Sequence, residues 1–364
     1  MLDLDAAAGG RLHVRPNLKA IIHAHPLPIA DCPGLWPAST LPLMPPADNA
    51  MTNVRSRLAP TPSGYLHAGN ALNFLFTWLM TRTAEGRLRL RIDDADNERT
   101  RPEFVADIFA QLDWLKLSWD EGPSGPDDFF ARHSQLLRRD RYRELLARLA
   151  QAGDLFSCAC SRRQLQEQAG SRLHPGNCRE RLSLVPGQPL RVRVPENTEV
   201  EVNGHTVALG RLMGDFVIWR RHGLPAYQLA SLADDLDYRI NLIVRGQDLI
   251  ESTAAQLFLA DRLGETDFAR ATFVHHPLLA SPEGGKLSKS HQALSLRHLR
   301  EAGVQPTEIY RLAARQLGIA SPAITGLSDL LTAFRQQTAQ GANVLFQDLT
   351  PKYKIGPRHS FKPG

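Results

Sequence analysis

The sequence predicts an α/β fold, and three observations lead to that prediction. Strand-like and helix-like segments alternate from about Met51 onward, which is the pattern of a parallel sheet covered by helices. Hydrophobic residues make up 43% of the 364 positions and charged residues 22%, as in soluble globular proteins. At roughly 150 residues per domain, this length favours two domains. We therefore expect an α/β core accompanied by a further module.

The N-terminal part differs from the rest of the chain. Residues 1–50 contain eight prolines, have no periodic apolar face and are followed directly by Met51. This composition is typical of a segment without a packed core. We expect 1–50 to be a flexible extension or the result of a mis-assigned start, with the folded protein beginning near Met51.

Residues 51–150 are expected to form the first half of the core. A strand at about 54–59 leads through a loop rich in Pro and Gly into an apolar helix at 71–80, and a second strand follows at 88–92. Two more helices then complete this half.

The first of these two helices has a clear start. Thr100 and Glu103 form a capping-box pair, and Pro102 stands in the first turn. The second helix covers about 132–150, where leucines and Tyr142 recur at helical spacing.

The middle of the chain, 151–225, interrupts this rhythm with a cysteine cluster and short alternating runs at 190–194 and 216–219. We interpret it as an inserted module. The second half of the core is expected at 226–294. Its elements are strands at 227–232, 241–244 and 273–279 and a helix at 254–263.

The remainder is expected to be a short helical region at 295–335, with helices at 295–317 and 325–335. Residues 336–364 are expected to be a basic tail, because Lys352, Lys354, Arg358 and Lys362 stand in the last 14 positions without an acid.

Membrane and secreted classes are excluded by composition. The longest stretch without charged residues, 58–81, is apolar only over 71–80, well short of the ~20 residues that a bilayer requires. The N-terminus has acids at Asp3 and Asp5 in place of the basic start of a signal peptide. We expect a cytoplasmic protein without a membrane partner, and the net charge of +5 favours anionic partners.

The cysteines indicate a metal site. Three of the four, Cys158, Cys160 and Cys178, lie within 21 residues, and His174 stands between them. Three thiolates and one imidazole are a complete tetrahedral set for one structural Zn²⁺. The alternative is a group of inert or disulfide-prone thiols.

Two further motifs point to a nucleotide. His67-Ala-Gly-Asn70 stands between the first strand and the first helix, where backbone N–H groups and the helix dipole favour a phosphate. Gly284-Gly-Lys-Leu-Ser-Lys-Ser290 is a glycine-flexible loop whose lysines could close over a polyphosphate. Taken singly, the first could be an ordinary turn and the second a solvated surface loop.

Together the two motifs resemble the signatures of class I aminoacyl-tRNA synthetases. This resemblance implies a Rossmann-type parallel sheet core, an inserted zinc-containing module similar to an acceptor-binding domain, and a short C-terminal helical region. It also implies ATP with Mg²⁺ as cofactors. His67 and Lys289 would be catalytic, and ATP would be bound by the two motifs, at His67, Gly69, Asn70, Lys286, Ser288 and Lys289.

Further segments resemble the glutamate-specific subgroup of that family. They are Arg57-Leu-Ala-Pro-Thr-Pro-Ser-Gly64, Arg91-Ile-Asp-Asp94, Ala226-Tyr-Gln-Leu-Ala230 and Val244-Arg-Gly-Gln-Asp248. The resemblance covers about 55–318.

The resemblance implies a glutamate site in which Arg57 and Arg245 bind the substrate carboxylates, Asp93 the α-ammonium group, and Tyr227 orients the substrate. The other residues of that site would be Leu58, Ala59, Pro60 and Thr61. The glutamate enzymes usually have Glu where this chain has Asp93, and Asp also occurs in glutaminyl enzymes, so glutamine stays open as a substrate. The alternative for both arginines is an internal salt bridge with Asp94 or Asp248.

The resemblance also bears on the metal and the acceptor. Small glutamyl-tRNA-synthetase-like proteins carry Tyr where this chain has His174, and His is the better zinc ligand. Only residues 291–364 follow the second motif, less than the anticodon-binding region of a full synthetase. This layout is similar to truncated enzymes that attach glutamate to queuosine in the anticodon loop of tRNA(Asp).

We therefore expect a monomeric ligase that uses ATP, L-glutamate and tRNA, with tRNA(Asp) as the acceptor. Three alternatives remain: a truncated glutamyl- or glutaminyl-tRNA synthetase that charges the tRNA 3′ end, a non-catalytic tRNA-binding paralogue, and a nucleotidyltransferase of small metabolites.

Overall fold

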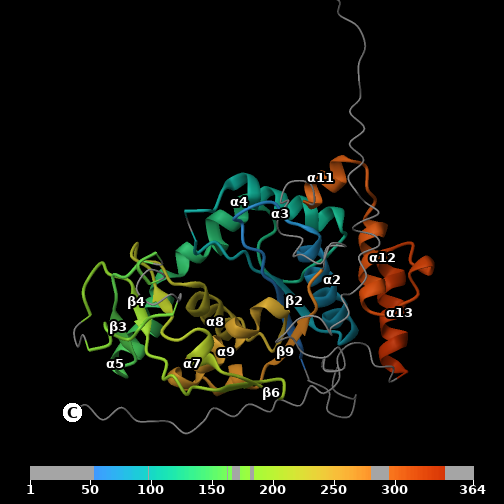
Figure 1. Cartoon of the computed structure of the whole chain (residues 1–364). Helices are drawn as coiled ribbons and strands as arrows, with labels where there is room; N and C mark the ends of the chain where they lie inside the picture. Colours follow the sequence, from blue (N-terminus) through green and yellow to red (C-terminus); the bar gives the residue numbers. More distant parts are fainter. Residues whose placement is uncertain are drawn as a thin grey trace, which may run out of the picture.

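The computed structural model describes residues 53–96, 98–161, 163–165, 173–180, 184–279 and 295–340 (Figure 1). The expected N-terminal extension and most of the expected basic tail lie outside these residues. No helix within the described part of the chain is long and apolar enough to cross a bilayer.

The core is a four-stranded parallel sheet with the order β2-β1-β8-β9. The strands are β1 (Arg55–Leu58), β2 (Arg87–Leu90), β8 (Leu242–Gly246) and β9 (Thr272–His276). All five residues of β8 are buried, as expected for a parallel strand covered on both faces. The predicted α/β class and four of the predicted strands are confirmed, with ends that differ by one to three residues.

Helices cover both faces of the sheet (Figure 1). Leu242 and Val244 belong to one hydrophobic cluster and Ile243, between them, to another, because successive side chains of a strand point to opposite faces. The helices on the first face are α2 (Ala68–Thr83), α3 (Pro102–Trp114), α11 (Leu296–Glu301), α12 (Pro306–Gln316) and α13 (Leu327–Ala339). Those on the second face are α5 (Arg139–Gln151), α8 (Tyr227–Asp237), α9 (Ile250–Leu263) and α10 (Thr266–Ala269).

The strand order fixes where a ligand is expected. The chain passes from β1 to β2 on one side and later adds β8 on the other side of β1, so the order reverses between β1 and β8. In open parallel sheets, ligands bind at such a point, outside the carboxyl ends of the strands.

Residues 155–219 form two small antiparallel sheets beside this core. One is built from β3 (Leu155–Ser157), β4 (Leu190–Val192) and β7 (Val217–Trp219). The other is a hairpin of β5 (Val200–Val202) and β6 (His205–Val207), closed by Asn203 and Gly204, which both have positive φ. The short helix α7 (Leu209–Leu212) follows the hairpin.

The strand predicted at 227–232 is wrong, because this segment begins the helix α8. Leu229, Leu232 and Ala233 have helical spacing and pack in the second hydrophobic cluster, whereas Ser231 and Asp235 lie among buried polar groups. The two faces of the helix have different partners, which a short apolar run in the sequence does not reveal.

The predicted capping box of α3 is also wrong. Arg101 is the N-cap residue and Pro102 begins the helix, so Glu103 comes one position too early to complete the box. The Thr100 hydroxyl instead donates to the backbone oxygen of Asp96.

The helix predicted at 132–150 begins only at Arg139. It is preceded by α4 (Pro126–Asp128), a π-helical turn (Phe129–His133) and a 3₁₀ turn (Gln135–Arg138). Two further 3₁₀ turns are at Gln247–Leu249 and Ser321–Ala323. The region predicted to be helical at 295–317 contains two helices, α11 and α12, and α13 extends to Ala339, beyond the expected end at 335.

Candidate functional site

Two buried arginines stand at the carboxyl ends of the strands on either side of the topological reversal. Arg57 belongs to β1 and Arg245 to β8, and their residues are 4% and 2% exposed. Arg57 donates from Nη1 to the backbone oxygen of Val244, at 3.4 Å, directly beside Arg245 in the chain. The sheet therefore brings together two residues that are separated by 188 positions in the sequence.

Asp235 of α8 is the counter-ion of this site. Its Oδ1 accepts hydrogen bonds from Arg57 Nε at 3.0 Å and from Arg91 Nη1 at 2.6 Å. Burial alone would raise the pKa of Asp235, but Arg57, Arg91 and Arg245 together hold this pKa below its usual value. The internal salt bridge of Arg57 therefore exists, with Asp235 as its partner instead of Asp94 or Asp248.

Arg245 has an unused hydrogen-bonding face. Nη1 donates to Thr253 Oγ1 at 3.1 Å and to Gln256 Oε1 at 2.9 Å. Nε and Nη2 are buried and have no partner among the described residues. Burial lowers the pKa of this guanidinium. A buried guanidinium with free donors is well suited to bind a carboxylate.

Asp93 is linked to Asp235 through Arg91, which donates to both carboxylates. Arg91 donates to both oxygens of Asp93, from Nε at 2.6 Å and from Nη2 at 3.0 Å. Burial raises the pKa of Asp93 to about 6, although Arg91 opposes this shift. Its backbone N–H donates to the oxygen of Pro60, which ties Asp93 to the predicted segment Leu58–Thr61.

Tyr227 stands at the start of α8, with Ala226 as the N-cap residue. Tyr227 is half-buried, and its phenol partly offsets the lowering of the pKa of Arg245 by burial. Ser231 and Asp235 follow at i+4 and i+8, and both accept hydrogen bonds from Arg91. One face of α8 is thus directed at the arginines.

His67, Gly69 and Asn70 form the start of α2. His67 Nδ1 accepts from Gly69 N at 3.1 Å, and Asn70 Oδ1 accepts from His67 N at 3.0 Å, which makes a capping box. Three residues further, Asn73 donates to the backbone oxygen of Val244, which also accepts from Arg57. The start of α2 therefore adjoins the arginine site, which consists of Arg57, Arg91, Arg245, Asp93 and Asp235.

Lys286, Ser288 and Lys289 of the second motif lie outside the described residues. The described chain continues at Ser295, which pairs with His67 in an antiparallel bridge. The described chain thus resumes beside the start of α2.

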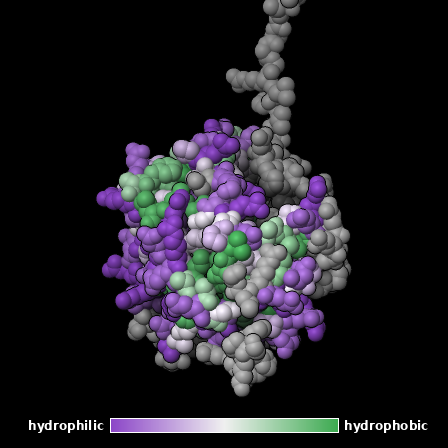
Figure 2. Space-filling view, turned by 90° about the vertical axis from the view of Figure 1, so that its left-hand side faces the viewer, coloured by the Kyte–Doolittle hydropathy of each residue, from purple (hydrophilic) through white to green (hydrophobic). Residues whose placement is uncertain are grey.

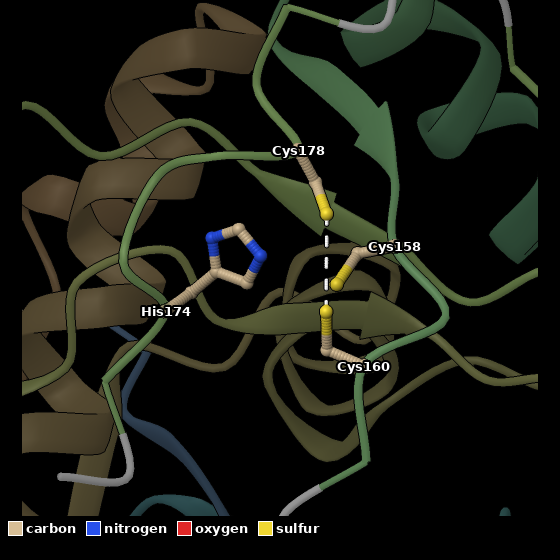
Figure 3. A group of neighbouring side chains, drawn as sticks. All are labelled: Cys158, Cys160, His174 and Cys178. Carbon is tan, nitrogen blue, oxygen red and sulfur yellow. Dashed lines mark hydrogen bonds between the residues drawn. The ribbon is translucent and has the colours of Figure 1, made fainter. Parts of the chain in front are cut away.

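Cys158, Cys160, His174 and Cys178 come together, with one ligand atom of each within 4.8 Å of the others (Figure 3). All three cysteines are free thiols, so the disulfide alternative does not apply to this structure. The Sγ atoms of Cys160 and Cys178 are 3.8 Å apart. Two sulfurs of a tetrahedral zinc site, each about 2.3 Å from the metal, are separated by about the same distance.

The imidazole of His174 completes this group. Nε2 faces the thiols in Figure 3 and is buried without a partner among the described residues. Burial raises the pKa of the Cys158 thiol, but hydrogen bonds from the Cys160 backbone and from Arg191 outweigh it, so the pKa is lowered overall. The donor set and the orphaned nitrogen fit a zinc ion.

The sequence did not reveal Asp235, Thr253 and Gln256, which hold the two arginines. The pair Asp234-Asp235 stands seven and eight positions after Tyr227, a helical spacing that would have placed Asp235 on the face of Tyr227. The expectation of a strand at 227–232 concealed this signal.

The family model for the catalytic domain of the class I tRNA synthetases for E and Q, glutamate and glutamine, matches residues 53–345. The chain belongs to this family. Its members are ligases of the aminoacyl-tRNA synthetase type, and the described part of the match contains the arginine site, the start of α2 and the cysteine cluster.

Curated proteins with two different names are similar to this chain. "Glutamyl-Q tRNA(Asp) synthetase" of Pseudomonas entomophila is 39% identical, with 81% of this chain and 96% of the relative covered. The protein of the same name from Symbiobacterium thermophilum is 38% identical, with 70% of this chain and 83% of the relative covered. "Glutamate–tRNA ligase 2" of Syntrophus aciditrophicus is 34% identical over 82% of this chain, which spans only 64% of that relative.

Solved structures agree on the fold. The glutamate-tRNA synthetase of Elizabethkingia anophelis superposes with a TM-score of 0.62 at 23% identity, covering 77% of this chain and 65% of that chain. The class I synthetase fold with a parallel sheet core is thereby established for this chain.

Figure 2 shows a mainly hydrophilic face with small separate hydrophobic areas. The exposed large hydrophobic residues are likewise single or paired along the chain: Tyr65, Phe130, Leu137, Leu184, Val185, Leu212 and Leu278. Scattered residues of this kind are normal on proteins in water.

Proposed function

We propose that this synthetase activates L-glutamate with ATP to glutamyl-adenylate and transfers the glutamyl group to a tRNA. The observation that carries the proposal is Arg245, which is buried, has two donor atoms without a partner among the described residues, and stands beside Arg57 at the reversal point of the sheet. A substrate with two carboxylates and one ammonium group matches two arginines and Asp93.

The residues divide the work as follows. Arg245 offers Nε and Nη2 to one carboxylate, and Tyr227 orients the substrate beside it. Asp235 keeps Arg57 and Arg91 in place, and Asp93 receives the α-ammonium group. The reacting carboxylate then attacks the α-phosphate of ATP, and pyrophosphate leaves.

ATP would lie over the start of α2. Gly69 and Asn70 follow the N-cap residue His67, where the first helical N–H groups and the positive end of the dipole favour phosphate oxygens. Lys286, Ser288 and Lys289 would hold the triphosphate, and Mg²⁺ would accompany ATP. Lys289 would neutralise the charge that develops as pyrophosphate leaves.

The acceptor proposed here is queuosine in the anticodon loop of tRNA(Asp). The support is the relatives named Glutamyl-Q tRNA(Asp) synthetase, which reach 38–39% identity, against 34–36% for those named Glutamate–tRNA ligase. A hydroxyl of queuosine would then attack the acyl carbon of the adenylate, and AMP would leave.

The cysteine cluster is proposed to hold one structural Zn²⁺. Three thiols, one imidazole nitrogen without a partner among the residues that the structure describes, and a sulfur separation of 3.8 Å fit that ion. A set of four protein ligands leaves no open position for substrate. We further propose that 151–225 is an inserted module around this ion, between catalytic halves at 51–150 and 226–294.

The decisive experiment is glutamate-dependent exchange of pyrophosphate into ATP without tRNA. We expect exchange with glutamate and much less with glutamine. The absence of exchange with any amino acid would contradict the proposal. A preference for glutamine would show that glutamine, and not glutamate, is the substrate.

A second assay tests the acceptor. Labelled glutamate is offered with tRNA(Asp) that contains or lacks queuosine, and nuclease mapping locates the label. We expect label in the anticodon loop only when queuosine is present. Label at the 3′ end would instead indicate an ordinary charging enzyme.

A further inference from the structure

The buried carboxylate Asp215 lies between the cysteine cluster and the small sheet that supports it. Its side chain is fully buried, and its Oδ1 accepts from the backbone N–H of Val194 at 2.9 Å. Arg179, next to Cys178, donates to both of its oxygens, from Nε at 2.6 Å and Nη2 at 2.7 Å. The same carboxylate thus holds the segment that carries one of the thiols.

Asp215 also faces the imidazole of the cluster. Its Oδ2 is 3.7 Å from Nδ1 of His174, and both side chains are excluded from solvent. Nδ1 has two neighbours that require different tautomers: Gly176 N, which donates to it at 3.1 Å, and the acceptor Asp215 Oδ2 at 3.7 Å. The contact with Gly176 requires a neutral ring whose proton is on Nε2. A ring in that tautomer cannot bind a metal through Nε2.

Ligation through Nε2 moves the ring proton to Nδ1, and this proton then needs an acceptor. Gly176 N is a donor and cannot serve. The carboxylate oxygen beside Nδ1 is Oδ2 of Asp215. A movement of the imidazole by less than one ångström brings Nδ1 within hydrogen-bonding distance of this oxygen.

We propose that Asp215 is the positioning residue of the metal site: it accepts the Nδ1 proton of His174, selects the tautomer that binds through Nε2, and through Arg179 fixes the neighbouring thiol. This inference rests on the zinc site proposed above. Acceptors of this kind orient histidine ligands and raise their basicity.

The test measures the affinity of the full chain for Zn²⁺ by competition with a chelator. Asp215→Asn is expected to weaken zinc binding about 10- to 100-fold. In a His174→Cys background, which has no imidazole to orient, the same substitution is expected to cost less than about threefold. Equal losses in both backgrounds, or none in the first, would overturn the inference.

Arg179→Gln is the matched control, because it removes the other side-chain partner of Asp215 and leaves the imidazole contact. We expect Arg179→Gln to weaken zinc binding less than Asp215→Asn does, and by about the same factor in both backgrounds. A loss for Arg179→Gln that is as large as that of Asp215→Asn and vanishes with His174→Cys would show that the ion pair with Arg179, and not the contact of Asp215 with Nδ1, positions the imidazole, which would contradict the inference.

A third measurement needs no substitution of Asp215 and is independent of whether that variant folds. In the zinc-loaded wild-type chain with ¹⁵N-labelled histidine, NMR should show a protonated Nδ1 and a metal-bound Nε2 for His174. Metal-bound Nδ1 would overturn the inference. A wild-type chain that binds no zinc would instead refute the zinc site itself, so the two failures are distinguishable.

Discussion

The arginine site and the cysteine cluster are both buried polar groups, but they are assembled differently. The arginine site joins β1, β8 and α8, and its central ion pair, Arg57 with Asp235, spans 178 positions. The cysteine cluster draws all four candidate ligands from 158–178 and forms a small hydrophobic cluster of its own with Phe156.

The difference lies in what each site still lacks. In the arginine site Asp93 and Asp235 are each paired with an arginine. Among the described residues, the buried charged donors without a partner there are Nε and Nη2 of Arg245, while Oδ2 of Asp235 and Nε2 of Gln256 are also unpartnered. In the cysteine cluster the group without a partner among the described residues is Nε2 of His174, which lies close to three thiols. The first site is suited to an anion and the second to a cation. Substitutions in the arginine site should therefore change glutamate activation and leave zinc content unchanged, and substitutions in the cysteine cluster should change zinc content.

The largest expected effect is the loss of the metal. Cys178→Ser should reduce zinc from about one per chain to none, because it removes a thiolate from a set of four. Elemental analysis of the purified protein measures this. Cys32→Ser, outside the cluster in the sequence, is the control and should keep its zinc. Tight stoichiometric binding that persists after the loss of two cluster residues would refute the site.

Arg245→Gln should lower kcat/KM for glutamate in the exchange reaction about 100- to 1000-fold, because hydrogen bonds to charged groups contribute about 1.5–3 kcal/mol each. Zinc content should not change. Arg270→Gln removes an arginine that is 77% exposed and should leave the kinetics as they are. Unchanged kcat/KM in Arg245→Gln would separate the arginine site from the substrate.

The pH dependence should follow Asp93, whose pKa is raised to about 6 by burial. If its ionised form binds the α-ammonium group, KM for glutamate should rise about tenfold per pH unit below pH 6 and be constant above it. Asp93→Asn should have a high KM without this inflection. An inflection that survives the substitution would belong to another group.

The raised pKa of Asp93 has the opposite effect on the stability of the folded protein, which should decrease as the pH rises. A carboxyl group whose pKa is raised in the folded state contributes stability that is fully present below 3.8 and is lost as the pH rises through about 6. In the unliganded protein, Asp93→Asn should therefore flatten the decline of thermal stability between pH 4 and pH 6. Substrate affinity and unliganded stability should thus change in opposite directions over this range.

The smallest effect is expected for Tyr227→Phe. Loss of a single hydroxyl that orients the substrate should raise KM for glutamate about fivefold, which corresponds to about 1 kcal/mol. Tyr65→Phe changes a phenol that is 38% exposed and bonded to Arg297, and it serves as the control. If kcat/KM for glutamate fell more than 100-fold in Tyr227→Phe, the hydroxyl would do more than orient the substrate.

The sequence alone was sufficient for some features that depend on short separations, although the predicted capping box of α3 and the predicted strand at 227–232 were wrong. The start of α2 with His67, Gly69 and Asn70, and the spacing of the cysteines and His174, are local patterns, and the structure arranges them as capping and donor groups. The parallel sheet was also predictable, because its strands are short buried runs separated by helices.

Only the tertiary structure showed which groups satisfy one another. A sequence shows Arg57, Arg245 and Asp235 as separate charges. The sheet reversal and the helical form of α8 decide that Asp235 pairs with Arg57, and that two donors of Arg245 have no partner in the part of the chain that the structure describes. In the same way, Asp215 is one acid among many until β4 and β7 place it beside His174. Residue types and local spacing follow from the sequence, whereas the pairing of buried charges depends on long-range packing, because each buried polar group must find its partner in the folded core.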